Sequence, residues 1–164
     1  MPRGTPGTIA VAAGDPGLML GYLHAPEETR ARYAPDGKWF LTGDLGEMDG
    51  SGAIAYLGRD DDMMNAGGFR VSPIEVETAL AAHPQVAEAA AVEIAVKEGA
   101  SIIAAFYAGE EIPEAELAAH AAGRLAHYKC PRLFVHCEAL PKSPNGKLMR
   151  RKIRQDYETS HDQA

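Results

Sequence analysis

The feature that most restricts how this chain can fold is a charged segment at residues 58–62, Gly-Arg-Asp-Asp-Asp. The segment has no apolar periodicity, and three adjacent carboxylates cannot all be buried, so we expect it to be exposed and mobile. Short β-leaning runs separated by glycine and proline precede it, and helical patterns follow it. We therefore predict a domain boundary here, with residues 1–58 in one domain and residues 59–164 in another.

The part before the boundary is expected to be rich in β-structure. Residues 6–12 and 38–45 favour strands, and residues 26–33 favour a short helix with acids in its first turn. An Asp-Gly-Ser-Gly turn at residues 49–52 leads into another strand at residues 53–57. These strands are too few to close a barrel, so we predict a β-rich fragment of a larger domain.

The part after the boundary favours an α+β domain, with helices packed on a small sheet. Ser72, Pro73 and Glu75 are typical of a helix start, as N-cap, first helical residue and partner in a capping box. The elements predicted from residue 68 onward follow the order αββαβα. They are the helix that begins at Ser72, a hairpin of residues 86–96 and 102–107 around Lys97-Glu98-Gly99, a helix at 114–126, a strand at 133–137 and a helix at 148–157.

Charge and hydropathy exclude some classes of protein. The net charge of −7 and the sequence pI of about 5.3 exclude a general nucleic-acid binder. No apolar run is long enough to span a bilayer, and residues 1–7 lack the apolar core of a signal peptide. We therefore expect no membrane span and a cytoplasmic location.

The cysteines and histidines do not form a recognisable metal-binding pattern. Cys130 and Cys137 favour a reduced, half-buried pair over a disulfide or a metal site. His120 and His127 lie seven residues apart on a predicted helix, near Cys130, but a fourth ligand is not evident. We therefore predict no metal site among these residues.

Residues 139–155 contain no acid but six basic residues, in a chain that is acidic as a whole. A local basic patch of this kind indicates a small anionic ligand. A solvated helix face is the alternative for the part from Arg150 to Arg154. The six basic residues are Lys142, Lys147, Arg150, Arg151, Lys152 and Arg154.

Three segments carry residue types suited to chemistry, and each also has a purely structural interpretation. Asp44 follows Thr42-Gly43 at a strand end, where a carboxylate can bind a vicinal diol such as ribose or accept bonds from turn amides. Gly67-Gly68 permits close approach of the backbone to a ligand, or a hairpin turn. Lys147 ends a loop fixed by two prolines and a glycine, where it can face an anion or be a surface lysine.

In this order and at these spacings, the segments resemble the ANL superfamily of adenylate-forming enzymes, and within it the AMP-dependent acyl-CoA synthetases. The resemblance covers about residues 4–155, and it implies a small C-terminal lid domain preceded by the β-rich end of a large N-terminal domain. The matching motifs are Thr42-Gly43-Asp44, the Gly58-Arg59 hinge segment with the acids after it, GGFRVSPIEVE from Gly67, and PKSPNGKLMR from Pro141.

The resemblance also implies a role for each matching residue. Asp44 is similar to the carboxylate that binds the ribose hydroxyls of ATP, and Arg59 to the arginine that contacts the nucleotide. Asp61 falls at the hinge about which the lid rotates. Lys147 resembles the catalytic lysine that bridges the acyl carboxylate and the α-phosphate. The Gly67-Gly68 pair belongs to the loop that lines the pantetheine channel.

The activity implied is the conversion of a carboxylic acid, ATP and CoA into acyl-CoA, AMP and pyrophosphate. The acid is adenylated first, and the CoA thiol then attacks the acyl-AMP. The cofactors implied are ATP/AMP with Mg²⁺, held through the large domain, and CoA. The family's phosphate loop, rich in Ser, Thr and Gly, has no match in this sequence. We therefore expect the chain alone to be inactive, with the rest of a large domain as its partner.

Two other functions fit the same residues. One is a stand-alone, non-catalytic binding or regulatory module that docks on a partner adenylating domain. The other is the lid of an adenylation domain that loads a carrier protein, although the GGFRVSP loop is more similar to that of CoA ligases. The sequence leaves a homodimer open. It does not identify the acid, because the pocket that selects the acid is expected to lie outside these residues.

Overall fold

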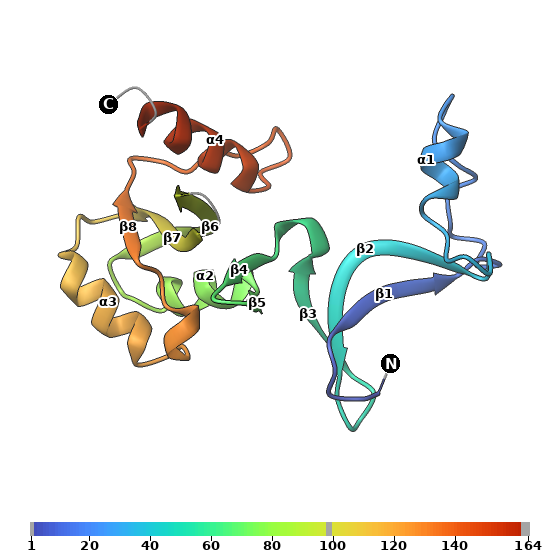
Figure 1. Cartoon of the computed structure of the whole chain (residues 1–164), viewed down its shortest axis with the longest axis horizontal. Coiled ribbons are helices and arrows are strands. Elements are labelled where there is room, and N and C mark those ends of the chain that lie inside the picture. The colour runs from blue at the N-terminus through green and yellow to red at the C-terminus, as the bar shows by residue number, and fades with distance from the viewer. Residues whose placement is uncertain (1, 98–99, 162–164) are drawn as a thin grey trace. The chain divides into compact units, whose positions relative to one another are not determined.

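The computed structural model describes residues 2–97 and 100–161 (Figure 1). The chain divides into two compact units, the first ending at Asp61 and the second beginning at Asp62. The division falls within the charged segment 58–62. Each unit has its own sheet and its own pattern of burial.

The first unit is built on an antiparallel sheet with the strand order β1-β2-β3. All three predicted strands are present, and β2 extends further than expected. Helix α1 is shorter than predicted, because Tyr33 forms a β-bridge with Phe40 instead of continuing the helix. The elements are β1 (Gly7–Ala12), α1 (Pro26–Arg30), β2 (Trp39–Met48) and β3 (Ile54–Arg59).

The connection between β2 and β3 is held by the Asp49 carboxylate, in the turn that the sequence predicts. Asp49 Oδ1 accepts hydrogen bonds from the Ser51 and Ala53 amides, at 2.8 and 3.0 Å, and from the Ser51 hydroxyl at 2.6 Å. A short polar side chain bonded to the following backbone stabilises a tight turn. The hydrogen bond from the Ser51 hydroxyl also lowers the pKa of Asp49.

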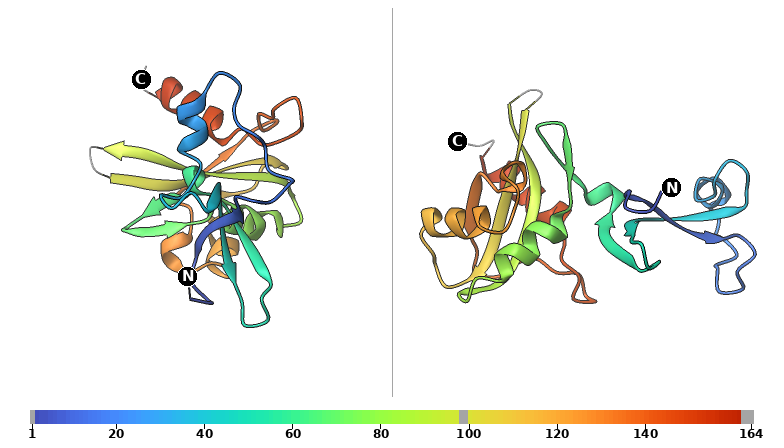
Figure 2. Two further views of the ribbon diagram at one scale, coloured as in Figure 1. Left: turned by 90° about the vertical axis from the view of Figure 1, so that its right-hand side faces the viewer. Right: turned by 90° about the horizontal axis from the view of Figure 1, so that it is seen from below.

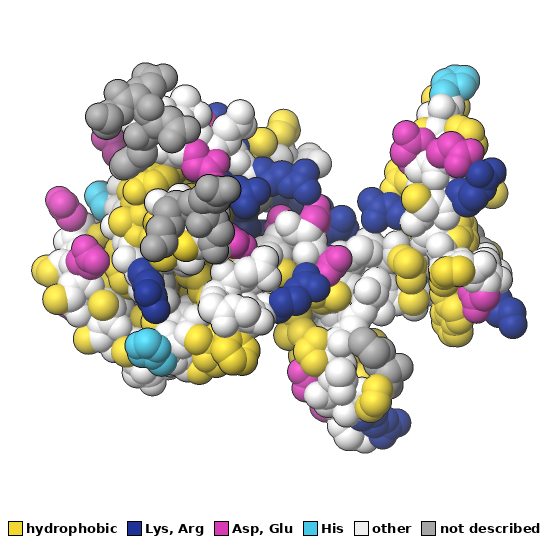
Figure 3. All heavy atoms as spheres, in the orientation of Figure 1, with side chains coloured by type: hydrophobic (Ala, Val, Ile, Leu, Met, Phe, Trp, Pro, Cys, Tyr) yellow, Lys and Arg dark blue, Asp and Glu magenta, His cyan; other side chains and the backbone are white. Residues whose placement is uncertain are grey.

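The first unit encloses little apolar surface. Among its described hydrophobic residues, Leu45 is buried at 8% exposure, whereas several large ones are open to solvent. Apolar side chains are visible on its surface in Figure 3. Because apolar burial is the main stabilising term in folding, this unit has little to hold it together by itself. The exposed residues are Leu20, Tyr22, Leu23, Trp39, Met48, Ile54 and Tyr56.

The second unit begins with a short hairpin, β4–β5, and continues into a sheet covered by helices (Figures 1 and 2). The strand order of this sheet is β6-β7-β8, with β6 antiparallel and β8 parallel to β7. The elements are β4 (Met64–Ala66), β5 (Phe69–Val71), α2 (Pro73–Ala81), β6 (Val86–Lys97), β7 (Ala100–Gly109), α3 (Glu114–Ala122), β8 (Leu133–His136) and α4 (Arg150–His161).

Alternate residues of the central strand β7 contribute to two separate cores, because successive side chains of a strand point to opposite faces. Ile103, Ala105 and Tyr107 pack with α2 and α3 on one face. Ala104 and Phe106 pack with α4 on the other face. The sheet is therefore buried on both sides, with α2 and α3 on one face and α4 on the other (Figure 1). The predicted α+β fold, with helices packed on a small sheet, is confirmed.

Helix α2 begins where the capping residues predict. Ser72 Oγ accepts a hydrogen bond from the Glu75 amide at 3.4 Å, and Pro73 occupies the first turn. The predicted hairpin corresponds to β6 and β7, but residues 98–99 of its turn lie outside the described residues. Helix α3 ends before Gly123, earlier than the predicted limit at residue 126.

The charged segment differs in part from the expectation of an exposed linker. Its first two residues, Gly58 and Arg59, complete β3, and Asp60–Asp62 form one turn of 3-10 helix. The first two acids of the turn are exposed. Asp62, however, is half-buried and paired with Arg150. An acid can be withdrawn from water here because a cation compensates it.

Candidate active site

The pairing of β2 with β3 brings Asp44 and the charged segment together. Asp44 lies opposite Arg59 in the register of the two strands. NH1 of Arg59 lies 3.4 Å from Asp44 Oδ1 and donates to the Thr42 carbonyl at 3.2 Å, while Nε lies 3.3 Å from Asp61 Oδ1. One arginine thus contacts both the predicted ribose-binding carboxylate and the predicted hinge residue.

This cluster remains accessible to solvent. The side chains of Asp44, Arg59 and Asp61 keep 33%, 39% and 48% exposure, respectively. Burial acts to lower the pKa of Arg59, but its hydrogen bond to Asp61 and the charges of Asp61 and Asp44 raise it overall. Arg59 is therefore a permanent cation, and its carboxylate partners can still be reached by a ligand.

Gly43 leaves room for the guanidinium groups beside Asp44. Its φ of +80° is a left-handed conformation that favours glycine. A Cβ at Gly43 would lie 3.1 Å from the Arg59 side chain and 3.2 Å from that of Arg32. Thr42 fixes the same turn, since its hydroxyl donates to a β1 carbonyl at 2.8 Å and accepts from the Asp44 amide at 3.1 Å. Arg32 is thus a second cation near the motif, which no sequence pattern indicated.

Lys147 ends a loop, residues 141–149, that is closed by its own backbone hydrogen bonds. The Ser143 amide donates to the Lys147 carbonyl at 2.8 Å, and the Met149 amide donates to the Pro141 carbonyl at 2.9 Å. The Lys147 side chain is exposed, and none of the described carboxylates forms an ion pair with it. An ordered loop therefore presents a cation that a ligand can reach.

The other lysine of this loop has a different environment. Lys142 forms an ion pair with Glu88 of β6, and its backbone forms a β-bridge with Leu148. Lys142 therefore anchors the loop to the sheet, whereas Lys147 is left open. The two lysines of one loop are thus distinguished by their contacts.

Gly67 and Gly68 form the turn of the β4–β5 hairpin, with φ values of +57° and +88°. The hairpin turn, one of the two interpretations that the sequence left open, is therefore present. The space beside both glycines is also open, because a Cβ on either would meet no described atom within 4 Å. Gly67 lines a cavity of about 340 Å³.

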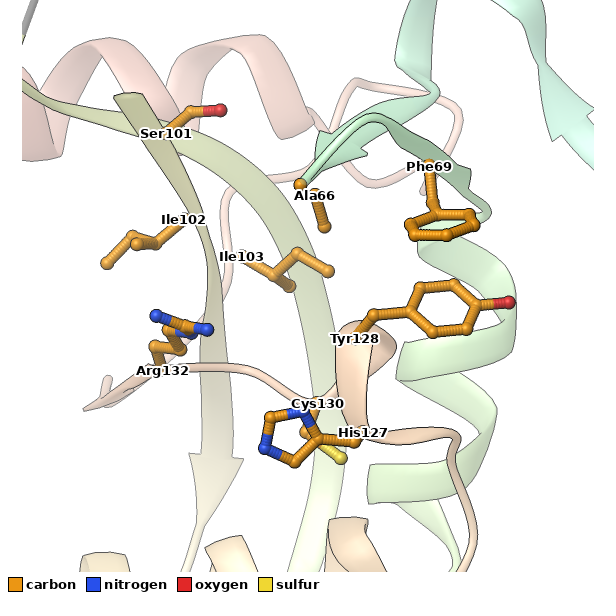
Figure 4. Close-up of a pocket in the computed structure, with 10 residues that line it drawn as sticks. Ala66, Phe69, Ser101, Ile102, Ile103, His127, Tyr128, Cys130 and Arg132 are labelled. Carbon is orange, nitrogen blue, oxygen red and sulfur yellow. The ribbon is translucent and has the colours of Figure 1, made fainter. Parts of the chain in front are cut away.

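This cavity combines aromatic and basic side chains (Figure 4). The rings of Phe69 and Tyr128 face each other at one side, with centroids 4.6 Å apart and planes inclined by 32°. Arg132 lies at the other side. Phe69 stands in the GGFRVSPIEVE motif, but no sequence pattern indicates that Tyr128 and Arg132 lie near it, because they are distant from it along the chain.

Arg150 corrects both interpretations of the basic stretch. Its side chain keeps only 20% exposure and its guanidinium pairs with Glu77 and Asp62, so Arg150 is neither on a solvated face nor open to an anion. The hydrogen bonds to Glu77, with the charges of Glu77 and Asp62, raise the pKa of Arg150 against the effect of burial. Lys152, in contrast, lies exposed on the helix surface and pairs with Asp156.

The remaining candidate ligands are dispersed or engaged elsewhere. Cys130 and Cys137 are free, half-buried thiols. Nε2 of His120 lies 2.9 Å from the Ala79 carbonyl, and its ring packs against His83. Within residues 2–97 and 100–161, no three His, Cys, Asp or Glu side chains gather into a group that could hold a metal ion. In the same residues, no helix is long and apolar enough to cross a membrane.

The predicted site residues therefore fall into two groups. Asp44, Arg59 and Asp61 lie together in the first unit. Lys147 and the Gly67-Gly68 turn belong to the second unit. Arg59 pairs with Asp44 through the register of β2 and β3.

Comparison with known proteins is consistent with the motifs. Residues 75–147 match the family described as the AMP-binding enzyme C-terminal domain. The chain is 35% identical over 161 residues to 4-coumarate--CoA ligase-like 9 of Oryza sativa subsp. japonica. That alignment covers 96% of this chain and 28% of the rice protein.

Solved structures give the same result. The o-succinylbenzoate CoA synthetase MenE from Bacillus subtilis, in complex with the acyl-adenylate intermediate, is 30% identical with a TM-score of 0.86, over 94% of this chain and 31% of MenE. The amide bond synthetase McbA from Marinactinospora thermotolerans is 28% identical with a TM-score of 0.85, over 96% of this chain and 32% of McbA. The chain thus spans less than a third of the length of each. With its ordered motifs and this shared fold, the chain belongs to the ANL superfamily of adenylate-forming enzymes.

Proposed function

We propose that this chain is the C-terminal portion of an ATP-dependent, AMP-forming acyl-CoA synthetase. The enzyme converts a carboxylic acid, ATP and CoA into acyl-CoA, AMP and pyrophosphate, and this portion supplies its catalytic lysine and its lid. The observation that carries the proposal is the state of Lys147: an exposed cation, without an ion pair to the described carboxylates, on a loop closed by hydrogen bonds.

In the first half-reaction, the acid attacks the α-phosphorus of ATP and pyrophosphate leaves. Both reactants are anions, and negative charge grows on the oxygens of the α-phosphoryl group. An ammonium held between the carboxylate and the α-phosphate stabilises this charge and aligns the reactants. Lys147 is suited to this role because backbone hydrogen bonds hold its loop in place. Its side chain is therefore not needed to fix the loop and can contact the substrate.

Asp44 and Arg59 are proposed to hold the nucleotide. The Asp44 carboxylate offers acceptors to the ribose hydroxyls, and Arg59 offers donors close to the same point. Their partial exposure, 33% and 39%, is compatible with access by a ligand. The Mg²⁺ that accompanies ATP is expected to be held by residues outside this chain.

In the second half-reaction, the lid is proposed to rotate about Asp61, so that Lys147 leaves and the Gly67-Gly68 turn takes its place. The open space beside the glycines suits the passage of the pantetheine arm. The adjoining cavity offers an aromatic pair and Arg132, groups that complement a base and a phosphate. The CoA thiol then attacks the acyl-AMP and AMP leaves.

We further propose that residues 1–58 form the end of a large domain and residues 59–164 form the lid. A cytoplasmic location, a place in fatty acid metabolism and a homodimer are part of the same proposal. The similarity to McbA, whose name is that of an amide bond synthetase, shows why the acceptor must be tested as well.

A domain exchange tests the proposal directly. The region of the B. subtilis o-succinylbenzoate CoA synthetase that matches this chain is replaced by the complete chain, and pyrophosphate release from ATP is measured with o-succinylbenzoate. Thioester formation is measured after CoA is added. We expect both steps in the hybrid, and neither in this chain alone or in the truncated synthetase.

The alternatives give different results in the same assay. A non-catalytic docking module would leave the hybrid without acid-dependent pyrophosphate release. A lid that serves a carrier protein would support adenylation but not transfer to free CoA. A hybrid that folds, binds ATP and remains inactive in both steps would contradict the proposed function.

A further inference from the structure

Arg150 is the first residue of α4 and follows Lys147 by three positions. Its Nε donates to Glu77 Oε1 at 2.7 Å and its NH2 donates to Glu77 Oε2 at 2.6 Å, which is a two-pronged pairing of guanidinium and carboxylate. Its NH1 donates to Asp62 Oδ2 at 3.3 Å. The side chains of Arg150, Glu77 and Asp62 keep only 20%, 14% and 20% exposure. This ion network is therefore largely withdrawn from water.

The two carboxylates connect Arg150 to different parts of the second unit. Glu77 lies on α2, and its Oε1 also accepts a hydrogen bond at 3.0 Å from the Ala91 amide of β6. Asp62 directly follows Asp61, the predicted hinge residue. One guanidinium thus joins the start of α4 to α2, to the sheet and to the segment that leaves the hinge.

The loop that carries Lys147 is consequently held at both ends. Lys142 secures its beginning to Glu88 on β6. Arg150 secures its end, one residue beyond Met149. Between these anchors the loop has its own backbone bonds, and we expect the anchors to limit how often those bonds open. What Arg150 adds is the position of the loop relative to the hinge segment.

We propose that Arg150 is a positioning residue for Lys147. It fixes the end of the Lys147 loop to the segment that leaves the hinge, so that the loop and the hinge exit move as one body when the lid rotates. The inference rests on the proposed function for the role of Lys147. The network itself is a property of the second unit and can be tested without activity.

Two variants separate positioning from simple charge neutralisation. Arg150→Lys keeps a cation near both carboxylates but cannot pair with Glu77 in a two-pronged way and reach Asp62 at once. Asp62→Asn leaves the Glu77 pairing intact and weakens only the contact with the hinge segment. Lys152→Ala is the matched control, because it removes a charge from the same helix at an exposed position.

Hydrogen exchange of the complete chain gives the first readout. In Arg150→Lys we expect the Ser143 and Met149 amides to exchange about tenfold faster, the effect of losing roughly one charge-assisted hydrogen bond on local opening. Asp62→Asn should act in the same direction, while Lys152→Ala should not. Amides of the β6–β7 ladder should be unchanged in all three variants. Should Arg150→Lys fail to fold, Asp62→Asn still decides.

Three outcomes would overturn the proposal. Unchanged exchange in the loop would show that the network does not hold it. An equal increase in the loop and in the β6–β7 ladder would show that Arg150 only stabilises the unit. A change in Arg150→Lys without one in Asp62→Asn would remove the connection to the hinge.

The hybrid enzyme gives the second readout. Arg150→Lys should lower kcat for adenylation about tenfold, with the KM for ATP unchanged, because a displaced Lys147 affects the transition state and not nucleotide binding. Equal loss in kcat and in ATP affinity would contradict positioning. An inactive unsubstituted hybrid would instead contradict the proposed function, and the exchange pattern would still decide the role of Arg150.

Discussion

Replacing Lys147 by alanine should separate the two half-reactions of the proposed enzyme while leaving the fold intact. The Lys147 side chain is exposed and has no ion pair with the described carboxylates, and its loop is closed through backbone atoms. Surface substitutions of this kind change the free energy of unfolding by about 0.5 kcal/mol or less. The unfolding midpoint of Lys147→Ala should therefore stay close to that of the unsubstituted chain.

The effect on adenylation should be far larger. A preorganised charge contact in the transition state contributes about 3–4 kcal/mol, which corresponds to two to three orders of magnitude in rate. Lys147→Arg should also be slow, because a planar guanidinium does not replace a compact ammonium between two anions. Thioester formation from preformed acyl-AMP and CoA should be nearly unchanged, since the lysine is withdrawn in that pose.

Lys142→Ala is the matched control in the same loop. Its ion pair with Glu88 joins side chains that are 41% and 43% exposed, so its loss should cost about 1 kcal/mol or less. Adenylation should then fall by a factor of about five at most. The assay is pyrophosphate release by the hybrid with o-succinylbenzoate, followed by thioester formation from purified acyl-AMP. Equal loss in both half-reactions for Lys147→Ala, or equal loss for the two lysines, would refute the reasoning.

Other substitutions and reagents test separate parts of the structure. Asp61→Pro should show the reverse pattern of half-reactions, with adenylation retained and thioester formation lost, because proline restricts the hinge. Loss of adenylation in this variant would contradict the proposed hinge role of Asp61. Gly109→Ala should lower the free energy of unfolding by more than about 2 kcal/mol in a urea titration, because φ is +138° and a Cβ would lie 2.2 Å from the Gln85 carbonyl oxygen. Burial raises the pKa of Cys130 and Cys137 above 9.0, so less thiolate is present at any lower pH, and alkylation by iodoacetamide at pH 8 should be slower than that of free cysteine.

The parts of the fold that were predicted correctly depend on local signals. Helix α2 follows from Ser72 and Pro73 because an N-cap and the residue after it act on their own backbone. The β6–β7 hairpin follows from two long apolar runs that are neighbours in the sequence and pair with each other as antiparallel strands. Errors concentrate at element ends, where tertiary contacts decide: Tyr33 leaves helix α1 to pair with Phe40.

The site residues show the same limit. The Lys147 loop was predicted from its prolines and glycine, which restrict the backbone locally. The environment of Arg150 was not, because its partners Glu77 and Asp62 lie 73 and 88 positions away. A run of basic residues looks the same in the sequence whether each side chain is solvated, paired with an acid or bound to a ligand. Only the ion pairs of Arg150 with Glu77 and Asp62 separate Arg150 from Lys152.

Arg59 allows a last prediction, because its contacts are numerous but individually weak. Two of its guanidinium nitrogens, Nε and NH1, make these contacts: NH1 reaches the Thr42 carbonyl at 3.2 Å and Asp44 at 3.4 Å, and Nε reaches Asp61 at 3.3 Å. The Arg59 side chain is 39% exposed. Long, partly exposed pairs of this kind contribute about 1 kcal/mol or less to stability. Arg59→Lys should therefore lower the unfolding midpoint only slightly, as should the control Arg30→Lys on α1.

Nucleotide binding should respond differently to the two substitutions. A lysine at position 59 offers one ammonium in place of a fork, so it cannot serve Asp44, Asp61 and a nucleotide at the same time. Loss of a charge-assisted hydrogen bond to the nucleotide should raise the KM for ATP of the hybrid by about tenfold, whereas Arg30→Lys should leave it unchanged. A lower unfolding midpoint with an unchanged KM for ATP would show that Arg59 stabilises the β2–β3 pair and does not contact the nucleotide.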